Sequence, residues 1–251
     1  YTIDQAVKDQ AVLPLLYEGR LVDQWISDKA GLDRRFEMIS RNLNAEQKED
    51  LKKKWARFSR VASSERRLEM IALDINEHYI NNLQGTGFKA MLATSSKYEA
   101  IKYHELFKTY GNIKTAFVIS ASDTREGHDE VDDSNKLYVA EAWFKILSVY
   151  GNEEAYLDSV QSKFVHGDEI ELLIVVDKLL TGFDAPCAAV LYIDKELKEH
   201  NLLQAIARVN RLYEGKEFGF IIDYRGLLGN LDSALNSYSA LAGFDEEDLS
   251  G

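Results

Sequence analysis

One stretch of the chain carries polar side chains at a spacing suited to binding phosphate groups. Gln204, Arg208 and Arg211 stand at positions i, i+4 and i+7, so on a helix all three would share one face. Two guanidinium groups and an amide on one face suit the spread negative charge of a phosphoryl group during transfer. The alternative is a solvated or salt-bridged helix face, which is the usual meaning of an arginine pair taken alone.

A second polar segment lies upstream, directly after an apolar run. Residues 172–176 are all aliphatic, and the loop after them contains Thr181, Gly182 and Asp184. A threonine hydroxyl suits contact with a phosphate, and a glycine lets the backbone approach a ligand closely. Two simpler interpretations stay open: that Thr181 only caps the chain, and that Asp184 only caps the turn at Pro186.

The elements that must position these residues alternate between strand and helix after residue 87. Strand patterns cover 89–94, 115–119, 170–176, 188–193 and 218–222, and helical patterns cover 97–110, 136–150, 153–164 and 202–212. Strands separated by helices imply an α/β fold with a parallel sheet flanked by helices and right-handed crossovers. Ligands of such sheets bind at the carboxyl ends of strands. We therefore expect the chemistry just after Val176, Ile193 and the helix that follows.

The part of the chain before this sheet is mostly helical in pattern. Residues 12–17 could form an extended strand, because their proline disfavours helix at its own and the preceding position. Between residues 45 and 83 apolar side chains recur at intervals of three and four, which predicts two helices. Within them, the stretch Lys48–Arg67 contains eight basic and three acidic residues. It is either a DNA-facing helix or, as we favour, an amphipathic helix that buries its aromatics and solvates its lysines.

Composition excludes several classes of protein. The chain has 251 residues, of which 45% are hydrophobic, which is enough for a folded core. The net charge of −12 argues against a polycation that coats DNA, but it permits a few local phosphate contacts. No apolar run approaches the roughly 18 residues that a membrane span needs. The single cysteine, Cys187, points to a reducing compartment, so we expect a cytoplasmic protein.

A metal site is not expected. The histidines have no ligand spacing among themselves or with Cys187. The acidic cluster 126–133 is expected to be a surface loop rather than a cation site. The chain begins at Tyr1 without a methionine, and we expect it to be a fragment.

Taken together, the two polar segments resemble motifs V and VI of superfamily 2 helicases and translocases. The pattern Gln-x-x-Ala-Arg-x-x-Arg of residues 204–211 follows a Thr-Gly-x-Asp loop at 181–184. The strand and helix of residues 89–107 resemble motif IV. More closely, several segments are similar to the R (restriction and motor) subunit of type I restriction enzymes, namely 1–7, 15–20, 74–79, 176–186, 191–195 and 203–211.

The resemblance implies a RecA-like fold and a motor function. The chain would be the second of two RecA-like lobes of an ATP-dependent translocase of double-stranded DNA, with ATP and Mg²⁺ bound mainly by the first lobe. By this resemblance, Arg211 would be the arginine finger, Arg208 would assist it, and Gln204 would bond near the attacking water or across the cleft. Thr181 would contact a DNA phosphate, and Gly182 would permit that approach. Asp184 would contact the nucleotide ribose or bind an arginine, which would couple the ATP cleft to the DNA. The resemblance implies that the nucleotide-binding residues are Gly182, Asp184, Arg208 and Arg211.

The chain departs from that family's pattern where the first lobe and the nuclease would lie. It contains no Gly-x-x-x-x-Gly-Lys-Thr/Ser loop and no Asp-Glu-x-x motif after a strand. We therefore expect that the chain alone neither hydrolyses ATP nor cuts DNA. Its expected partners are the first lobe and nuclease domain of the same subunit, the modification and specificity subunits, and double-stranded DNA, with no membrane.

Two other functions remain as alternatives. One is a RecA-like lobe of another superfamily 2 helicase, in repair or RNA remodelling, and the other is a RecA-like interaction module without catalysis. The expected domains are an N-terminal linker and helical segment (1–84), RecA-like helicase domain 2 (85–230) and a C-terminal tail (231–251).

Overall fold

The computed structural model describes residues 9, 11–20, 65–120, 133–176, 184–197 and 199–226. The chain forms two compact units, one made of Tyr1–Leu21 with Ile75–Gly251 and the other of Val22–Asp74. Several predictions fall outside the described residues: the loop residues Thr181 and Gly182, most of the basic stretch (48–64), most of the acidic cluster (126–132) and the tail (231–251).

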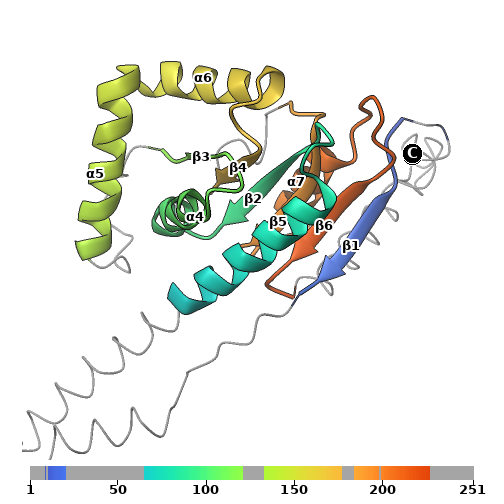
Figure 1. Cartoon of the computed structure of the whole chain (residues 1–251), viewed down its shortest axis with the longest axis horizontal. Helices are drawn as coiled ribbons and strands as arrows, with labels where there is room; N and C mark the ends of the chain where they lie inside the picture. The colour runs from blue at the N-terminus through green and yellow to red at the C-terminus, as the bar shows by residue number, and fades with distance from the viewer. Residues whose placement is uncertain are drawn as a thin grey trace, which may run out of the picture. The chain divides into compact units, whose positions relative to one another are not determined.

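A six-stranded parallel sheet forms the centre of the first unit (Figure 1). Its strand order is β1-β6-β5-β2-β4-β3. The strands are β1 (Leu15–Gly19), β2 (Lys89–Thr94), β3 (Thr115–Val118), β4 (Leu172–Val175), β5 (Ala188–Asp194) and β6 (Gly219–Asp223). The parallel α/β sheet predicted from the sequence is therefore confirmed, and the extended piece around Pro14 joins it as an edge strand beside β6.

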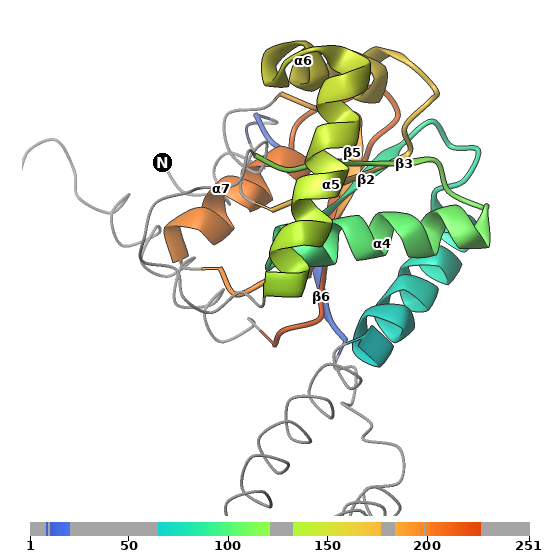
Figure 2. The ribbon, with the colours of Figure 1, turned by 90° about the vertical axis from the view of Figure 1, so that its left-hand side faces the viewer.

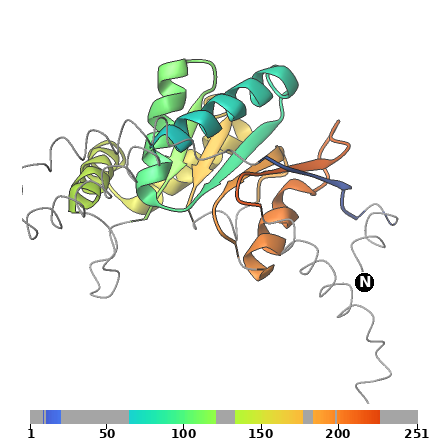
Figure 3. The same ribbon diagram turned by 90° about the horizontal axis from the view of Figure 1, so that it is seen from below.

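Helices cover both faces of this sheet, which is why its central strands are continuous apolar runs. The helices that pack on the sheet are α4 (Lys97–Tyr110) and α7 (Glu199–Val209), while α5 (Asp133–Tyr150) packs on α4 and α6 (Glu153–His166). A further helix covers residues 65–82. Every residue of β2 and β4 is buried. Figures 2 and 3 show α7 on the face opposite to α4.

The bounds of α4 follow from its caps. Ser96 has an extended backbone and accepts a hydrogen bond from the Glu99 amide, as an N-cap serine does. Gly111 ends the helix with φ of 72°, in the left-handed region where glycine lacks the steric cost of a Cβ atom, and its amide bonds to the Phe107 carbonyl. The predicted range 97–110 is the observed one.

The connections of β2 and β5 leave the sheet in opposite directions. These two strands are neighbours, yet the chain runs from β2 through α4 to β3 on one side, and from β5 through α7 to β6 on the other. Such a reversal of strand order is a topological switch point, where loops diverge outside the carboxyl ends of the strands.

The buried tyrosine of β5 has a polar partner in the core. Tyr192 in β5 is fully buried, and its hydroxyl lies 2.7 Å from Nδ1 of His78. The His78 ring also meets the Phe220 ring at a centroid distance of 5.6 Å. This contact ties residue 78, in the helix over 65–82, to the two strands β5 and β6.

Within the described ranges, no helix is both long and apolar enough to cross a membrane. The same ranges contain no cluster of three or more His, Cys, Asp and Glu side chains that could hold a metal ion.

Candidate functional site

The three polar residues predicted to share a helix face are divided by the end of α7. Gln204 and Arg208 lie on this helix, but the helix ends at Val209, so Arg211 lies just beyond it in a bend. The predicted helical range 202–212 was therefore wrong at its end. The reason is tertiary: the Asn210 carbonyl accepts a hydrogen bond of 2.7 Å from the Leu13 amide, in the segment that leads into β1.

Close packing after α7 reinforces this turn. A Cβ atom on Gly219, the first residue of β6, would lie 2.3 Å from the Val209 carbonyl oxygen. Any side chain there would force the helix end away from the sheet. The Gly219 amide also donates to the Pro14 carbonyl at 2.9 Å. The end of α7 is thus fixed against the starts of β1 and β6.

These contacts place the arginine pair at the amino ends of the strands. Arg208 and Arg211 flank the helix end that packs on the first residue of β6. Asp184 precedes β5, and an Ala188 to Ala185 backbone bond of 3.0 Å closes the turn between them. The expectation that the chemistry follows the carboxyl ends of strands does not hold for this group, because a helix that follows a parallel strand returns to the amino edge.

Arg211 and Asp184 form an ion pair between Nη1 and Oδ1. Both side chains are exposed, at 40% and 66%. An exposed pair of this kind contributes about 0–1 kcal/mol, so the Arg211 guanidinium can leave Asp184 at little cost. The structure thus places Asp184 against an arginine, and its role at a nucleotide stays a prediction.

Arg208 lies within the electrostatic reach of that pair. Partial burial lowers the pKa of its guanidinium, the charge of Arg211 lowers it further, and the charge of Asp184 opposes both. Three charged groups, two positive and one negative, therefore gather at the amino edge with an excess of positive charge. Gln204 lies one helical turn before Arg208 and is partly exposed. Such a group is suited to binding a polyanion.

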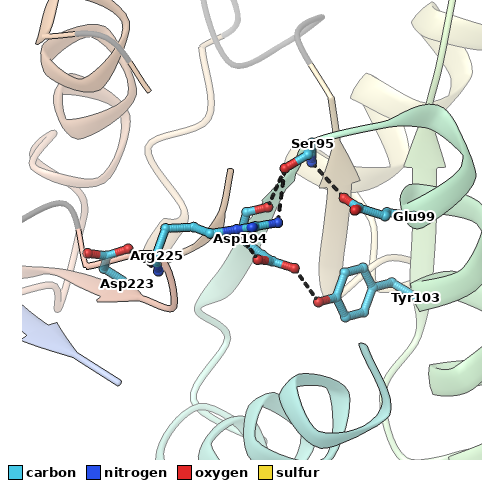
Figure 4. Close-up of polar contacts among 6 residues, drawn as sticks. All are labelled: Ser95, Glu99, Tyr103, Asp194, Asp223 and Arg225. Carbon is cyan, nitrogen blue, oxygen red and sulfur yellow. Dashed lines mark hydrogen bonds and ion pairs between the residues drawn. The ribbon is translucent and has the colours of Figure 1, made fainter. Parts of the chain in front are cut away.

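A second polar cluster lies at the opposite, carboxyl edge of the sheet, directly after Ile193 (Figure 4). None of its residues was among the predicted site residues. Asp194 ends β5 and is fully buried. Its Oδ2 accepts a hydrogen bond of 2.6 Å from the Tyr103 hydroxyl, and its Oδ1 lies 2.7 Å from Nε of Arg225. Nη2 of Arg225 donates to Ser95 Oγ at 3.2 Å. The cluster thus joins α4, β5 and the segment after β6 at the switch point.

A second buried carboxylate extends the cluster toward the edge strand β1. Asp223 ends β6 and is fully buried. It accepts hydrogen bonds from the Tyr17 hydroxyl and, at 2.8 Å, from the Arg225 amide. One sequence signal was available: both β5 and β6 are apolar strands that end in aspartate. A buried carboxylate needs donors, so these endings predict polar neighbours without saying which.

Residues 86–226 match the family model of type I restriction enzyme subunit R domain 3. The chain belongs to the type I restriction R-subunit family. Residues 1–49 also match a SWI2/SNF2 ATPase model. The resemblance expected from the sequence is thereby confirmed.

Two relatives illustrate how much of an R subunit the chain represents. It is 31% identical over 96% of its length to the MjaIXP endonuclease subunit assigned to a type I restriction enzyme of Methanocaldococcus jannaschii. It is 30% identical over 97% of its length to the type I restriction enzyme HindI endonuclease subunit of Haemophilus influenzae. The chain spans 22% of either relative, so it corresponds to about one fifth of such a subunit.

A solved structure supports the fold. A fragment described as the HsdR subunit of a type I restriction enzyme from Vibrio vulnificus YJ016 superposes with a TM-score of 0.55 and 15% identity. The match covers 95% of this chain and 37% of that fragment. It agrees with the RecA-like class of the parallel sheet.

Proposed function

We propose that the chain is the second RecA-like lobe of the ATP-driven DNA motor of a type I restriction R subunit. The observation that carries this proposal is the cationic group at the amino edge, in which Arg211 is exposed, weakly held by Asp184 and close to Arg208. The match of residues 86–226 to an R-subunit domain gives this group its context.

Arg211 acts as the arginine finger in this proposal. Its guanidinium stabilises the negative charge on the transferring phosphoryl group, which is the main task of protein residues in this chemistry. An arginine in a bend after a helix is less constrained than one inside the helix, and its exposure leaves it accessible to a nucleotide bound by another lobe. ATP would supply the reacting phosphoryl group and Mg²⁺ would neutralise its charge, both bound mainly by the first lobe.

The neighbouring residues assist that step. Arg208 adds positive charge, and Gln204 offers an amide for a hydrogen bond near the attacking water. Asp184 holds Arg211 while no phosphate is present. Thr181 and Gly182, in the loop between Val176 and Asp184, contact a DNA phosphate. Val176 follows β4 at the carboxyl edge and Asp184 precedes β5 at the amino edge, so the chain between them passes from one edge to the other. In this proposal that connection couples the nucleotide to the DNA.

The remaining parts of the machine lie outside this chain. The domains we propose are the linker and helical segment (1–84), the lobe itself (85–230, with β1 as an added edge strand) and the tail (231–251). The partners are the first lobe and nuclease domain of the same subunit, the modification and specificity subunits, and double-stranded DNA in the cytoplasm. The chain alone is inactive in ATP hydrolysis and DNA cleavage.

Asp184→Asn in the full-length subunit tests the role of the ion pair. Releasing Arg211 from an exposed pair of this strength is expected to raise the DNA-free rate of ATP hydrolysis by up to about fivefold. The DNA-stimulated rate should change less, so the stimulation ratio falls. The measurement is steady-state ATP hydrolysis with and without duplex DNA.

Asp158→Asn serves as the control, because Asp158 is an exposed acid on α6. It should leave both rates unchanged. A lower DNA-free rate in Asp184→Asn would contradict a holding role, since it would mean that the carboxylate itself assists hydrolysis. An unchanged rate would show that Arg211 does not partition between Asp184 and phosphate.

A further inference from the structure

We propose that Lys216 is a positioning residue for the arginine finger, and this inference rests on the proposed function. Its side chain connects the segment that follows Arg211 to the segment that follows Asp184. Lys216 lies between α7 and β6 and is only 6% exposed. Its ammonium group donates to the carbonyl oxygens of Pro186 at 3.0 Å and Ala188 at 2.7 Å.

The two ends of this connection adjoin the two partners of the ion pair. Pro186 and Ala188 belong to the turn that leads from Asp184 into β5. On the other side, the Lys216 amide bonds to the Tyr213 carbonyl at 3.0 Å, which closes a turn shortly after Arg211. The ammonium group therefore sets the distance between the segments that carry Asp184 and Arg211.

The Arg211–Asp184 ion pair and the Lys216 hydrogen bonds differ in burial, and this difference indicates which of them fixes the relative position of the two segments. The Arg211–Asp184 pair is exposed at both side chains and can open in water. The Lys216 bonds are charge-assisted and lie in a buried site, where each is stronger and harder to replace by water. When Arg211 leaves Asp184 to reach a phosphate, the Lys216 bonds still join its segment to the turn that follows Asp184.

The lysine occupies this place at a cost to stability. Burial lowers the pKa of Lys216 to about 8, and Cys187 acts in the opposite direction. A methionine would fill a similar volume without burying an amine. The side chain thus contributes its hydrogen bonds rather than its bulk, which agrees with a positioning function.

The test replaces Lys216 by methionine in the full-length subunit and measures DNA-stimulated ATP hydrolysis. An arginine finger displaced by up to about one ångström loses much of its effect on the hydrolysis rate. We expect kcat to fall about 10- to 100-fold, with the KM for ATP within about twofold of wild type, because the first lobe supplies most of the nucleotide contacts.

Lys89→Met is the matched control. Lys89 is also buried, at 7% exposure, and its ammonium group donates to the Gly167 carbonyl after α6. Its loss should lower stability in a similar way but leave kcat near wild type. Lys216→Gln, which keeps an N–H donor, should retain more activity than Lys216→Met, and it replaces that variant in the assay if the methionine protein does not fold.

A double variant separates positioning from a general structural effect. If Lys216 acts through Arg211, adding Lys216→Met to Arg211→Ala should cause no further fall in the single-turnover hydrolysis rate. A further fall of tenfold, an unchanged kcat in Lys216→Met, or an equal loss in Lys89→Met would each overturn the inference. Normal hydrolysis in Arg211→Ala alone would instead refute the proposed function.

Discussion

In the full-length subunit, Arg211→Ala is expected to lower the kcat of DNA-stimulated ATP hydrolysis by about 10³-fold or more, the range seen when an arginine finger is removed. In the proposed role the guanidinium contacts the phosphoryl oxygens only as charge redistributes in the transition state, so we expect the KM for ATP to change little. Arg211→Lys should recover only part of the loss, because an ammonium group cannot donate two parallel hydrogen bonds in the fixed geometry of a guanidinium.

Arg20→Ala is the control for that experiment. Arg20 also forms a partly exposed ion pair, with Glu18 at 2.8 Å on β1, so the variant removes a comparable surface contact away from the amino-edge group. Its rate should equal that of wild type. A rate in Arg211→Ala within a factor of about three of wild type, far from the 10³-fold expected of a finger, would show that Arg211 only pairs with Asp184.

Asp194→Ala is expected to lower the free energy of unfolding by about 3 kcal/mol, as when one partner of a buried ion pair is removed. The carboxylate is fully buried, and its loss removes one acceptor of the Tyr103 hydroxyl and the ion-pair partner of Arg225. Arg225 is 26% exposed, so water can reach part of its guanidinium, and this keeps the loss from being larger. In urea denaturation the midpoint should fall while the slope stays constant.

Asp158→Ala on α6 provides the comparison, because that carboxylate is exposed and its removal should change stability by less than about 0.5 kcal/mol. A loss in Asp194→Ala as small as that of the control would mean that the carboxyl-edge cluster does not hold β5 to α4. The stability loss of Asp194→Asn should lie between those of Asp194→Ala and Asp158→Ala, because the amide oxygen of the asparagine can still accept a hydrogen bond from Tyr103.

The elements were predictable where local chemistry and burial agree. β4 is a short run of aliphatic residues buried on both faces, and α4 carries its own start and stop signals at Ser96 and Gly111. The end of α7 was not predictable, since Arg211 continues a helical spacing in the sequence. What ends the helix is the Leu13 amide and the close approach of Gly219, both remote from it along the chain.

The site was predictable in its residue types but not in its location. The spacing of Gln204, Arg208 and Arg211 identified the cationic group, and the structure brings Arg211 to Asp184. The general preference for the carboxyl ends of strands misplaced it, because the direction of α7 carries its last turn to the amino edge. The Asp194–Arg225 pair and the buried Lys216 depend on contacts between distant segments, which spacing along one chain cannot reveal.

The most direct measurement is a structure of the full-length subunit with duplex DNA, Mg²⁺, ADP and a metal fluoride that mimics the transferring phosphoryl group. We predict that the Arg211 guanidinium has left Asp184 and lies about 3 Å from a fluoride, with Arg208 beside it. An Arg211 side chain still paired with Asp184 while the mimic is fully bound would contradict the assignment of this lobe as the source of the finger.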